Sequence, residues 1–305
     1  MPTARQASSR KGTEISQQWL AMFFIAPVAI YLLVFQAYPL IQELLLSFTS
    51  SSLLSPVETE FVGLENYRTL VYDPEFQQTL WVTVVYTIGC VFGAIAMGLG
   101  AALLLDAPFA GRGAARALVT IPWAAPPVAV ALVGVWMFNA QYGIINHGLR
   151  AIGLDFGNWL DSPDLALPAI LLTTIWQIFP FSAVVILASL QGVPKELREA
   201  ATMDGANRWN VFLAVVWPGI RPTIALLSLF TTVWSLRRFD LIWLMTQGGP
   251  LGRTNTLVID LYRRAFVYLQ LGPAAAAGVI GLVIALAVTL IYFTLSTRAE
   301  RAAKR

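Results

Sequence analysis

The chain has 305 residues, of which 57% are apolar and 12% are charged, and its formal net charge is +3. Soluble domains carry roughly 25% charged residues, so this composition excludes an ordinary soluble enzyme and indicates an integral membrane protein. The sequence has no basic stripe with interleaved aromatic residues, and we therefore expect no nucleic-acid partner.

Six segments are long and apolar enough to cross a bilayer, which takes about 20 residues as a helix. In hydrocarbon each backbone amide must be hydrogen-bonded within its own segment, so α-helices are expected. The sequence therefore predicts an all-α membrane protein with six transmembrane helices, near residues 19–41, 79–105, 117–140, 166–190, 217–244 and 273–295.

These spans divide the chain into four parts. We expect an N-terminal tail over 1–18, then a first transmembrane helix with an outer amphipathic segment over 19–78. A core of five transmembrane helices follows over 79–295, and a C-terminal tail closes the chain over 296–305.

The distribution of charge predicts the orientation, because Lys and Arg concentrate on the cytoplasmic side of membrane proteins. Basic residues lie in both tails and in two of the connections, at Arg5, Arg10, Lys11, Arg112, Arg116, Lys195, Arg198, Arg208, Arg298, Arg301, Lys304 and Arg305. The other connections carry acids, at Glu58, Glu60, Glu65, Asp73, Glu75, Asp155, Asp161 and Asp164. Both termini are therefore expected in the cytoplasm.

The second and third spans contain residues that pack or break helices. Gly89 and Gly93 stand four apart, a spacing that lets another helix, of this chain or of a second subunit, approach closely. Pro122, Pro126 and Pro127 predict a kinked or broken third span. Such a break either lines a cavity, as broken helices of transporters do, or is a simple packing kink.

A polar block separates the fourth and fifth spans at residues 194–218, PKELREAATMDGANRWNVFLAVVWP. Pro194 suits a first helical turn, and Gly205 suits a left-handed helix end. Asn207 can cap a helix that begins at Arg208. The block is either an ordinary amphipathic connector or a folded surface that a soluble partner grips.

The sequence EAATMDGA at 199–206, followed by Phe212 and Pro218, resembles the EAA loop of ABC importer permeases. Trp217 departs from that family's usual aliphatic run before the proline. The resemblance extends over nearly the whole chain to the maltose-type, MalF-like branch of sugar permeases, through residues 61–76, 121–128, 142–146, 175–181, 237–250 and 254–266.

This resemblance implies a type I ABC importer permease fold with a cytoplasmic coupling helix, in a bacterial cytoplasmic membrane. The residues implied to contact an ATP-binding subunit are Glu199, Ala200, Ala201, Asp204, Gly205 and Ala206. The chain would then be one of two different permease subunits, working with two ATP-binding-cassette subunits and an extracytoplasmic sugar-binding protein or lipoprotein.

Polar side chains within spans are candidates for a substrate pathway. Six positions match those that contact sugar in the maltose-type permease, at Thr174, Gln177, Phe181, Trp234, Ser235 and Arg238. Their identities differ from that family's usual set, so the same sugar is not implied, and Arg238 suits an anionic or phosphorylated substrate. Arg237 and Asp240 stand three apart and are either a structural ion pair or part of a polar cavity wall.

The expected function is ATP-driven uptake of a di- or oligosaccharide, or of a related polyol or sugar phosphate such as glycerol phosphate. Cys90 and His147 lack companions for a metal site, and without a phosphate-binding loop ATP and Mg²⁺ must bind to another chain. Two alternatives remain open, an ion-gradient-driven transporter and an integral membrane enzyme. The first would use Asp240 as its only candidate mid-span carboxylate, and no catalytic motif supports the second.

Overall fold

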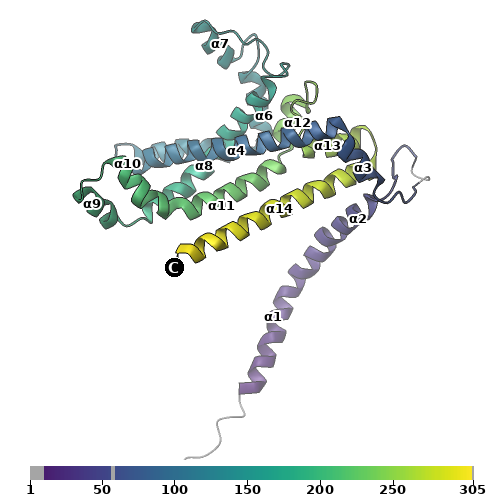
Figure 1. Cartoon of the computed structure of the whole chain (residues 1–305), viewed down its shortest axis with the longest axis horizontal. Coiled ribbons are helices and arrows are strands. Elements are labelled where there is room, and N and C mark those ends of the chain that lie inside the picture. The colour runs from purple at the N-terminus through teal and green to yellow at the C-terminus, as the bar shows by residue number, and fades with distance from the viewer. Residues whose placement is uncertain (1–9, 56–58, 304–305) are drawn as a thin grey trace, which may run out of the picture.

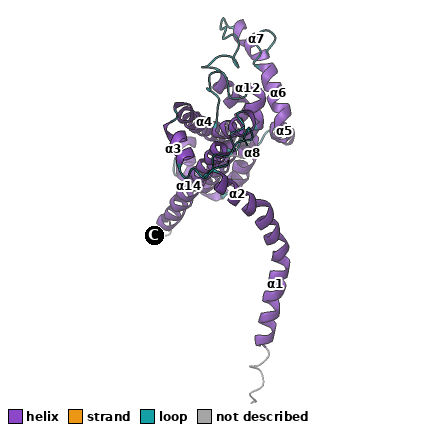
Figure 2. Cartoon of the chain, turned by 90° about the vertical axis from the view of Figure 1, so that its right-hand side faces the viewer, coloured by secondary structure: helices purple, strands orange, loops and turns teal. Residues whose placement is uncertain are grey.

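The computed structural model describes residues 10–55 and 59–303, with side chains from 19 to 296. Of the charges used to predict orientation, Arg5, Glu58, Lys304 and Arg305 lie outside the described residues. Figure 2 shows that the described chain is helical, and its only β-type pairs are two isolated bridges, Thr49 with Phe61 and Ser52 with Gln270.

Four long helices lie side by side and form the body of the molecule (Figure 1), namely α4 (Pro74–Asp106), α8 (Ala166–Gln191), α11 (Trp217–Leu236) and α14 (Leu271–Ala303). Helix α4 packs along α8, and α11 contacts α4, α8 and α14. Together with the first helix, they provide five helices long and apolar enough to cross a membrane. The all-α fold and the existence of these five spans were predicted correctly.

The third predicted span is broken into α5 (Arg112–Ala124) and α6 (Pro127–Met137), which meet at 95° and count as a sixth span if taken together. Pro126 and Pro127 lack the N–H groups needed to continue α5. Ala125 precedes them and is extended, with φ −72° and ψ 138°, as a residue before proline prefers. The prediction of a kinked or broken span is therefore confirmed.

The fifth predicted span, 217–244, is wrong at its end. Helix α11 stops at Leu236, and a separate short helix, α12 (Asp240–Thr246), follows after three residues. Phe239 in this break lies 5.6 Å from the ring of Trp243 and 4.8 Å from that of Tyr262. Packing against these rings, and not a proline or glycine, accompanies the break.

The first span comprises α1 (Arg10–Leu32), a π-helical turn η1 (Leu33–Ala37) and α2 (Tyr38–Leu46). It projects from the body in Figure 1, and none of its most apolar window is buried within this chain. Only α2 packs against α14. The exposed apolar surface of this span is therefore left for lipid or for another subunit.

The glycine spacing of α4 serves packing within this chain. An added Cβ would lie 2.8 Å from Leu171 at Gly89 and 2.3 Å from Ile175 at Gly93, both on α8. At Gly98 it would lie 2.6 Å from the Ser182 Cβ and 3.1 Å from the backbone nitrogen of Ala183. Three glycines thus allow α4 to approach α8 closely.

The end of the body that bears α3 (Glu65–Tyr72) is fastened by Arg264, which belongs to the π-helical turn η3 (Arg263–Val267) after α13 (Leu257–Tyr262). Its guanidinium lies 2.6 Å from Asp260 and 3.2 Å from Asp73, the residue that caps α4. Burial alone would lower the pKa of Arg264, but hydrogen bonds and charge from these two carboxylates outweigh it and raise the pKa.

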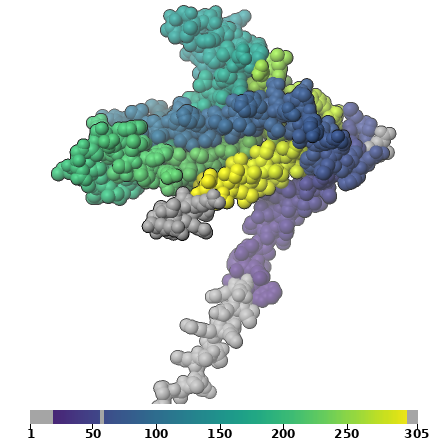
Figure 3. Space-filling model, viewed as in Figure 1, coloured from purple at the N-terminus to yellow at the C-terminus, as the bar shows by residue number. Residues whose placement is uncertain are grey.

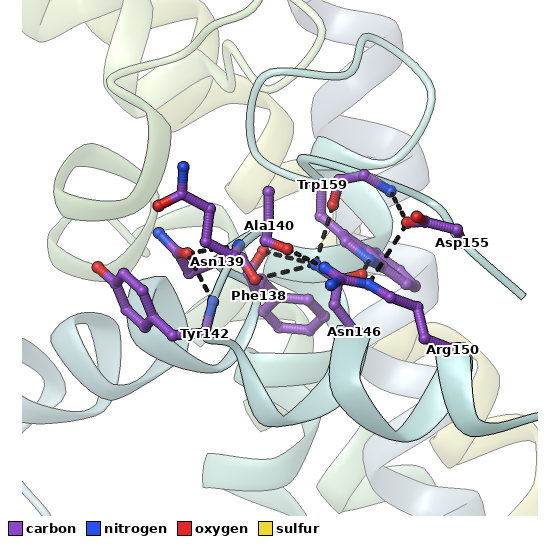
Figure 4. Close-up of polar contacts among 10 residues, drawn as sticks. Phe138, Asn139, Ala140, Tyr142, Asn146, Arg150, Asp155 and Trp159 are labelled. Carbon is purple, nitrogen blue, oxygen red and sulfur yellow. Dashed lines mark hydrogen bonds and ion pairs between the residues drawn. The ribbon is translucent and has the colours of Figure 1, made fainter.

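A smaller lobe beyond α6 contains α7 (Ile144–Ala151) and is organised around the buried Asn146 (Figure 4). The Asn146 amide nitrogen donates to the carbonyls of Asn139 and Gly157 at 3.0 and 2.9 Å, and its oxygen accepts from the Trp159 indole at 2.8 Å. One amide therefore fixes three separate points of the loop.

Candidate functional site

The polar block forms the compact helix–elbow–helix that its sequence predicts. Helix α9 (Lys195–Met203) follows Pro194, which precedes the helix and is not in its first turn. Gly205 has φ +83°, a left-handed conformation that favours glycine. The Asn207 side chain then accepts a hydrogen bond from the Asn210 N–H at 2.8 Å and caps α10 (Arg208–Val211).

This block protrudes from one end of the long helices, opposite α3 (Figures 1 and 3). Of the six residues predicted to couple to an ATPase, four are exposed and two half-buried; the exposed ones are Glu199, Ala200, Asp204 and Gly205, and the half-buried ones are Ala201 and Ala206. Met203, also on α9, is 88% exposed. A projecting surface with apolar and acidic residues is suited to insertion into a complementary groove.

The block is nevertheless firmly attached to the body. Arg198 on its inner face lies 3.1 Å from the Asp106 carboxylate at the end of α4, and donates to the Leu190 carbonyl of α8 at 2.7 Å. Val193 and Val216 pack in an apolar cluster with the ends of α4 and α8. Arg198 therefore connects α9 directly to two of the long helices.

Sequence reasoning missed the pairing of Asp106 with Arg198. Asp106 ends an apolar span on the side where the basic residues gather, and this isolated acid was the available signal. The ion pair is partly shielded, since the two side chains are 28% and 23% exposed.

A second candidate site lies between the break that follows α5 and the break that follows α11. We call it the Trp–Arg cavity; it has a volume of about 490 Å³ and is lined by Trp123, Ala125, Pro127, Gln177, Ile178, Trp234, Arg237, Arg238 and Asp240. Volumes of about 300–1,000 Å³ are typical of small-molecule sites. The breaks after α5 and α11 thus face α8 across a chamber of a size suited to a ligand.

The structure brings three of the six predicted substrate residues to the wall of this cavity, Gln177, Trp234 and Arg238. Phe181 is not in the lining but packs against two residues that are, since its ring lies 5.5 Å from that of Trp123 and 5.1 Å from that of Trp234. Thr174 and Ser235 are buried outside the lining.

Thr174 is withdrawn because its hydroxyl lies 2.8 Å from the Ile170 carbonyl and 3.0 Å from the Tyr86 hydroxyl. The predicted substrate residues of α8 therefore divide, because Thr174 packs against α4 while Gln177 lines the cavity. Trp123 was missed as a lining residue, although the prolines that follow it had indicated a break near a cavity.

Gln177 lies in the wall of the cavity and uses only part of its hydrogen-bonding capacity. Its nitrogen donates to the Ala125 carbonyl at 3.2 Å, at the end of α5, while its buried oxygen has no partner among the described residues. This bond satisfies one of the carbonyls that a helix end leaves free, and the oxygen remains an unused acceptor.

The predicted ion pair between Arg237 and Asp240 is not formed. Both side chains are exposed and line the cavity, and neither they nor Arg238 makes an ion pair or a side-chain hydrogen bond to any residue that the structure describes. The break after α11 turns the helix-like spacing of three into a bend, so the two charges no longer share one helical face. They belong to the polar wall that was the other interpretation.

Comparison with known proteins identifies the family of the whole chain. The family described as "Binding-protein-dependent transport system inner membrane component" matches residues 94–301. A sulfoquinovosyl glycerol transport system permease protein of Agrobacterium fabrum is 38% identical, over 92% of this chain and 91% of that protein. A trehalose/maltose transport system permease protein of Thermococcus litoralis is 34% identical, over 90% and 92%.

The fold is also similar to one chain of a bacterial ABC transporter involved in the import of the acidic polysaccharide alginate. The TM-score is 0.81 at 25% identity, covering 95% of this chain and 99% of that one. The chain therefore belongs to the family of inner membrane components of binding-protein-dependent transport systems, as a permease subunit of an ABC importer with sugar permeases among its relatives.

Proposed function

We propose that this permease subunit passes a saccharide through the Trp–Arg cavity by alternating access, driven by an ATP-binding subunit that grips the polar block. The observation that carries the proposal is the joint geometry of the two sites. A protruding block is tied to α4 and α8 through Arg198, and α8 leads from that block to Gln177 in the cavity wall.

The polar block has the properties of a lever end. Glu199 and Asp204 are exposed and suited to basic residues of an ATPase, while the low Ala200 and Ala201 let a groove approach closely. Because Gly205 and the Asn207 cap fix the elbow, a push on α9 moves the block as a unit. ATP and Mg²⁺ bind to the partner, since this sequence contains no G-x-x-x-x-G-K-[ST] loop.

The remaining partners follow from the same arrangement. A second permease of the same family completes the pathway and covers part of the exposed first span. An extracytoplasmic binding protein docks on the lobe at 139–165, which Asn146 holds in shape. Both termini and the polar block lie in the cytoplasm of a bacterial cell, in keeping with the basic residues near them.

The cavity fits a sugar chemically. Trp123 and Trp234 present indole faces to it, being 51% and 41% exposed, and the apolar face of a sugar ring packs on such surfaces. Gln177 and the charged side chains supply hydrogen bonds to hydroxyls. Relatives are named for sulfoquinovosyl glycerol and for trehalose and maltose, which supports a saccharide class. The family assignment leaves the ion-driven transporter and the membrane enzyme without support.

The test is uptake into proteoliposomes that contain this chain, the second permease and the ATPase, with the binding protein outside and ATP inside. We expect uptake to require ATP and to persist when ion gradients are collapsed. Glu199→Lys should abolish uptake with normal membrane insertion, because it reverses a charge in the proposed ATPase contact. Glu65→Lys reverses an exposed helical acid at the other end of the molecule and should transport normally. Normal uptake by Glu199→Lys would refute the lever.

A further inference from the structure

The Trp–Arg cavity carries more positive than negative charge. Two arginines, Arg237 and Arg238, and one acid, Asp240, line it, and none is paired with a described residue. The side chains therefore contribute a net charge of +1 from two cations and one anion. The three residues lie at the break between α11 and α12, and unpaired charges that line a cavity next to the spans are functional candidates.

The helix ends around the cavity do not account for this excess. Helices α5 and α11 end there and α6 and α12 begin there. A helix end contributes about half a unit charge, negative at the C-terminus and positive at the N-terminus. Two ends of each sign cancel, so the excess positive charge belongs to the arginine side chains and is available to a ligand.

On the basis of the proposed function, we infer that the transported saccharide is anionic and carries a single acidic group, a carboxylate, sulfonate or phosphate monoester, bound by Arg237 and Arg238. A planar guanidinium binds such oxyanions through two parallel hydrogen bonds. A neutral sugar would use the indole faces and Gln177 equally well but would leave both arginines without a counterion.

The other groups of the wall restrict the ligand to a saccharide with one acidic group. Trp123 and Trp234 pack on a ring that a free inorganic anion lacks. The unpartnered oxygen of Gln177 accepts from a ring hydroxyl, as does the Asp240 carboxylate. Asp240 also disfavours a second acidic group, because two like charges that share one site repel each other.

The experiment measures binding to the purified complex of both permeases and the ATPase in nanodiscs, without the binding protein. The probes are glucuronate, glucose 6-phosphate and glucose 6-sulfonate, with glucose as the neutral sugar and inorganic sulfate as the anion without a ring. We expect at least one charged sugar to bind about tenfold or more tighter than glucose and sulfate, the scale of one hydrogen bond to a charged group.

Arg238→Gln and Arg237→Gln should each remove most of this preference, because each should lower the affinity for the charged sugar several-fold more than the affinity for glucose. Arg221→Gln is the matched control, because Arg221 is an exposed arginine of α11 that does not line the cavity. Size-exclusion chromatography checks that every variant still assembles with the ATPase.

Equal binding of charged and neutral sugars, binding of no charged sugar, or the same loss in Arg221→Gln would overturn the inference. If sulfate bound as tightly as the charged sugars, the inference that the cavity recognises a sugar ring would be refuted. The proposed function is tested separately, because it would be refuted if ATP drove no uptake in proteoliposomes. ATP-driven import of a neutral sugar would refute the anionic substrate and leave the proposed function intact.

Discussion

The attachment of the polar block to the body offers the sharpest quantitative test, through the ion pair of Asp106 with Arg198. Their charged atoms lie 3.1 Å apart, with the two side chains about a quarter exposed. Exposed pairs contribute about 0.2–1 kcal/mol, and removal of one partner of a fully buried pair costs about 3–5 kcal/mol. For this intermediate burial we expect about 1–2 kcal/mol, the lower value for Asp106→Asn, which keeps an acceptor oxygen, and the higher for Asp106→Ala.

This free energy should appear as loosening of the block. A loss of about 1–2 kcal/mol raises the population of the detached block roughly 5- to 30-fold. Amide hydrogen exchange over 195–212 in the purified complex should accelerate by that factor, and substrate imported per ATP hydrolysed should fall while ATPase activity persists. The bond from Arg198 to the Leu190 carbonyl remains, so the block should not come away entirely.

A double-mutant cycle with Arg198→Gln isolates the pair. Asp106 also lies 3.9 Å from Arg112, an ion pair that only the Asp106 variant removes. The two single variants should still not add, because both remove the pair with Arg198, and the coupling energy should be about 1 kcal/mol or more. Arg208→Gln removes an exposed cation of the same block that has no ion pair among the described residues and should leave exchange unchanged. Additive effects, or unchanged exchange in Asp106→Ala, would show that the ion pair does not hold the block, which would then depend on its apolar contacts and on the bond from Arg198 to the Leu190 carbonyl.

Three further outcomes are expected. Gly98→Ala should destabilise the purified protein by about 1–3 kcal/mol in thermal unfolding, because the added Cβ would meet Ser182 and the α8 backbone. Gly100→Ala is the control and should be neutral or stabilising, because the space around Gly100 is open. Equal effects of the two substitutions would contradict the close approach of α4 and α8. Asn146→Leu should leave an indole N–H and two carbonyls without partners. The local stability of the lobe should fall by about 2–4 kcal/mol, and limited proteolysis should cleave the lobe faster than in the wild-type protein. Trp234→Ala should weaken sugar binding roughly 5- to 30-fold with the ATPase still assembled. Trp81→Ala, which removes an exposed tryptophan of α4, is the control, and the same loss of binding in that variant would show that the Trp234 indole is not part of the sugar site.

Much of the fold could be predicted because it depends on local and strong signals. Apolar length sets the long helices, and consecutive prolines set the break between α5 and α6. The elbow of the polar block follows from Gly205 and Asn207, whose backbone preferences require no knowledge of the rest of the chain. Such features are local, so a single sequence contains them.

The break after Leu236 was not predictable in this way. Residues 237–239 include neither proline nor glycine, and the stacking of Phe239 on Trp243 and Tyr262 depends on where α13 lies. For the same reason, helical spacing suggested that Arg237 and Asp240 share one face, although the break separates them. Which side of α8 faces α4 is decided by tertiary packing at Gly89 and Gly93, and the spacing of polar residues alone does not reveal it.

The continuity of α8 explains how two sites so different in chemistry can act together. It runs without interruption from Gln177 at the cavity to Gln191 beside the polar block, about 20 Å at 1.5 Å per residue. Pro180 lies within it, three residues from Gln177, and removes one backbone hydrogen bond on the cavity side. Below that point Ser182 is pressed against Gly98 of α4, so the lower part of α8 moves with α4 and with the Asp106 pair. In the proposed mechanism, a displacement of the polar block therefore passes along this paired segment to Pro180, three residues from Gln177. The position at which α8 can bend most readily is thus the position at which a bend would change the cavity.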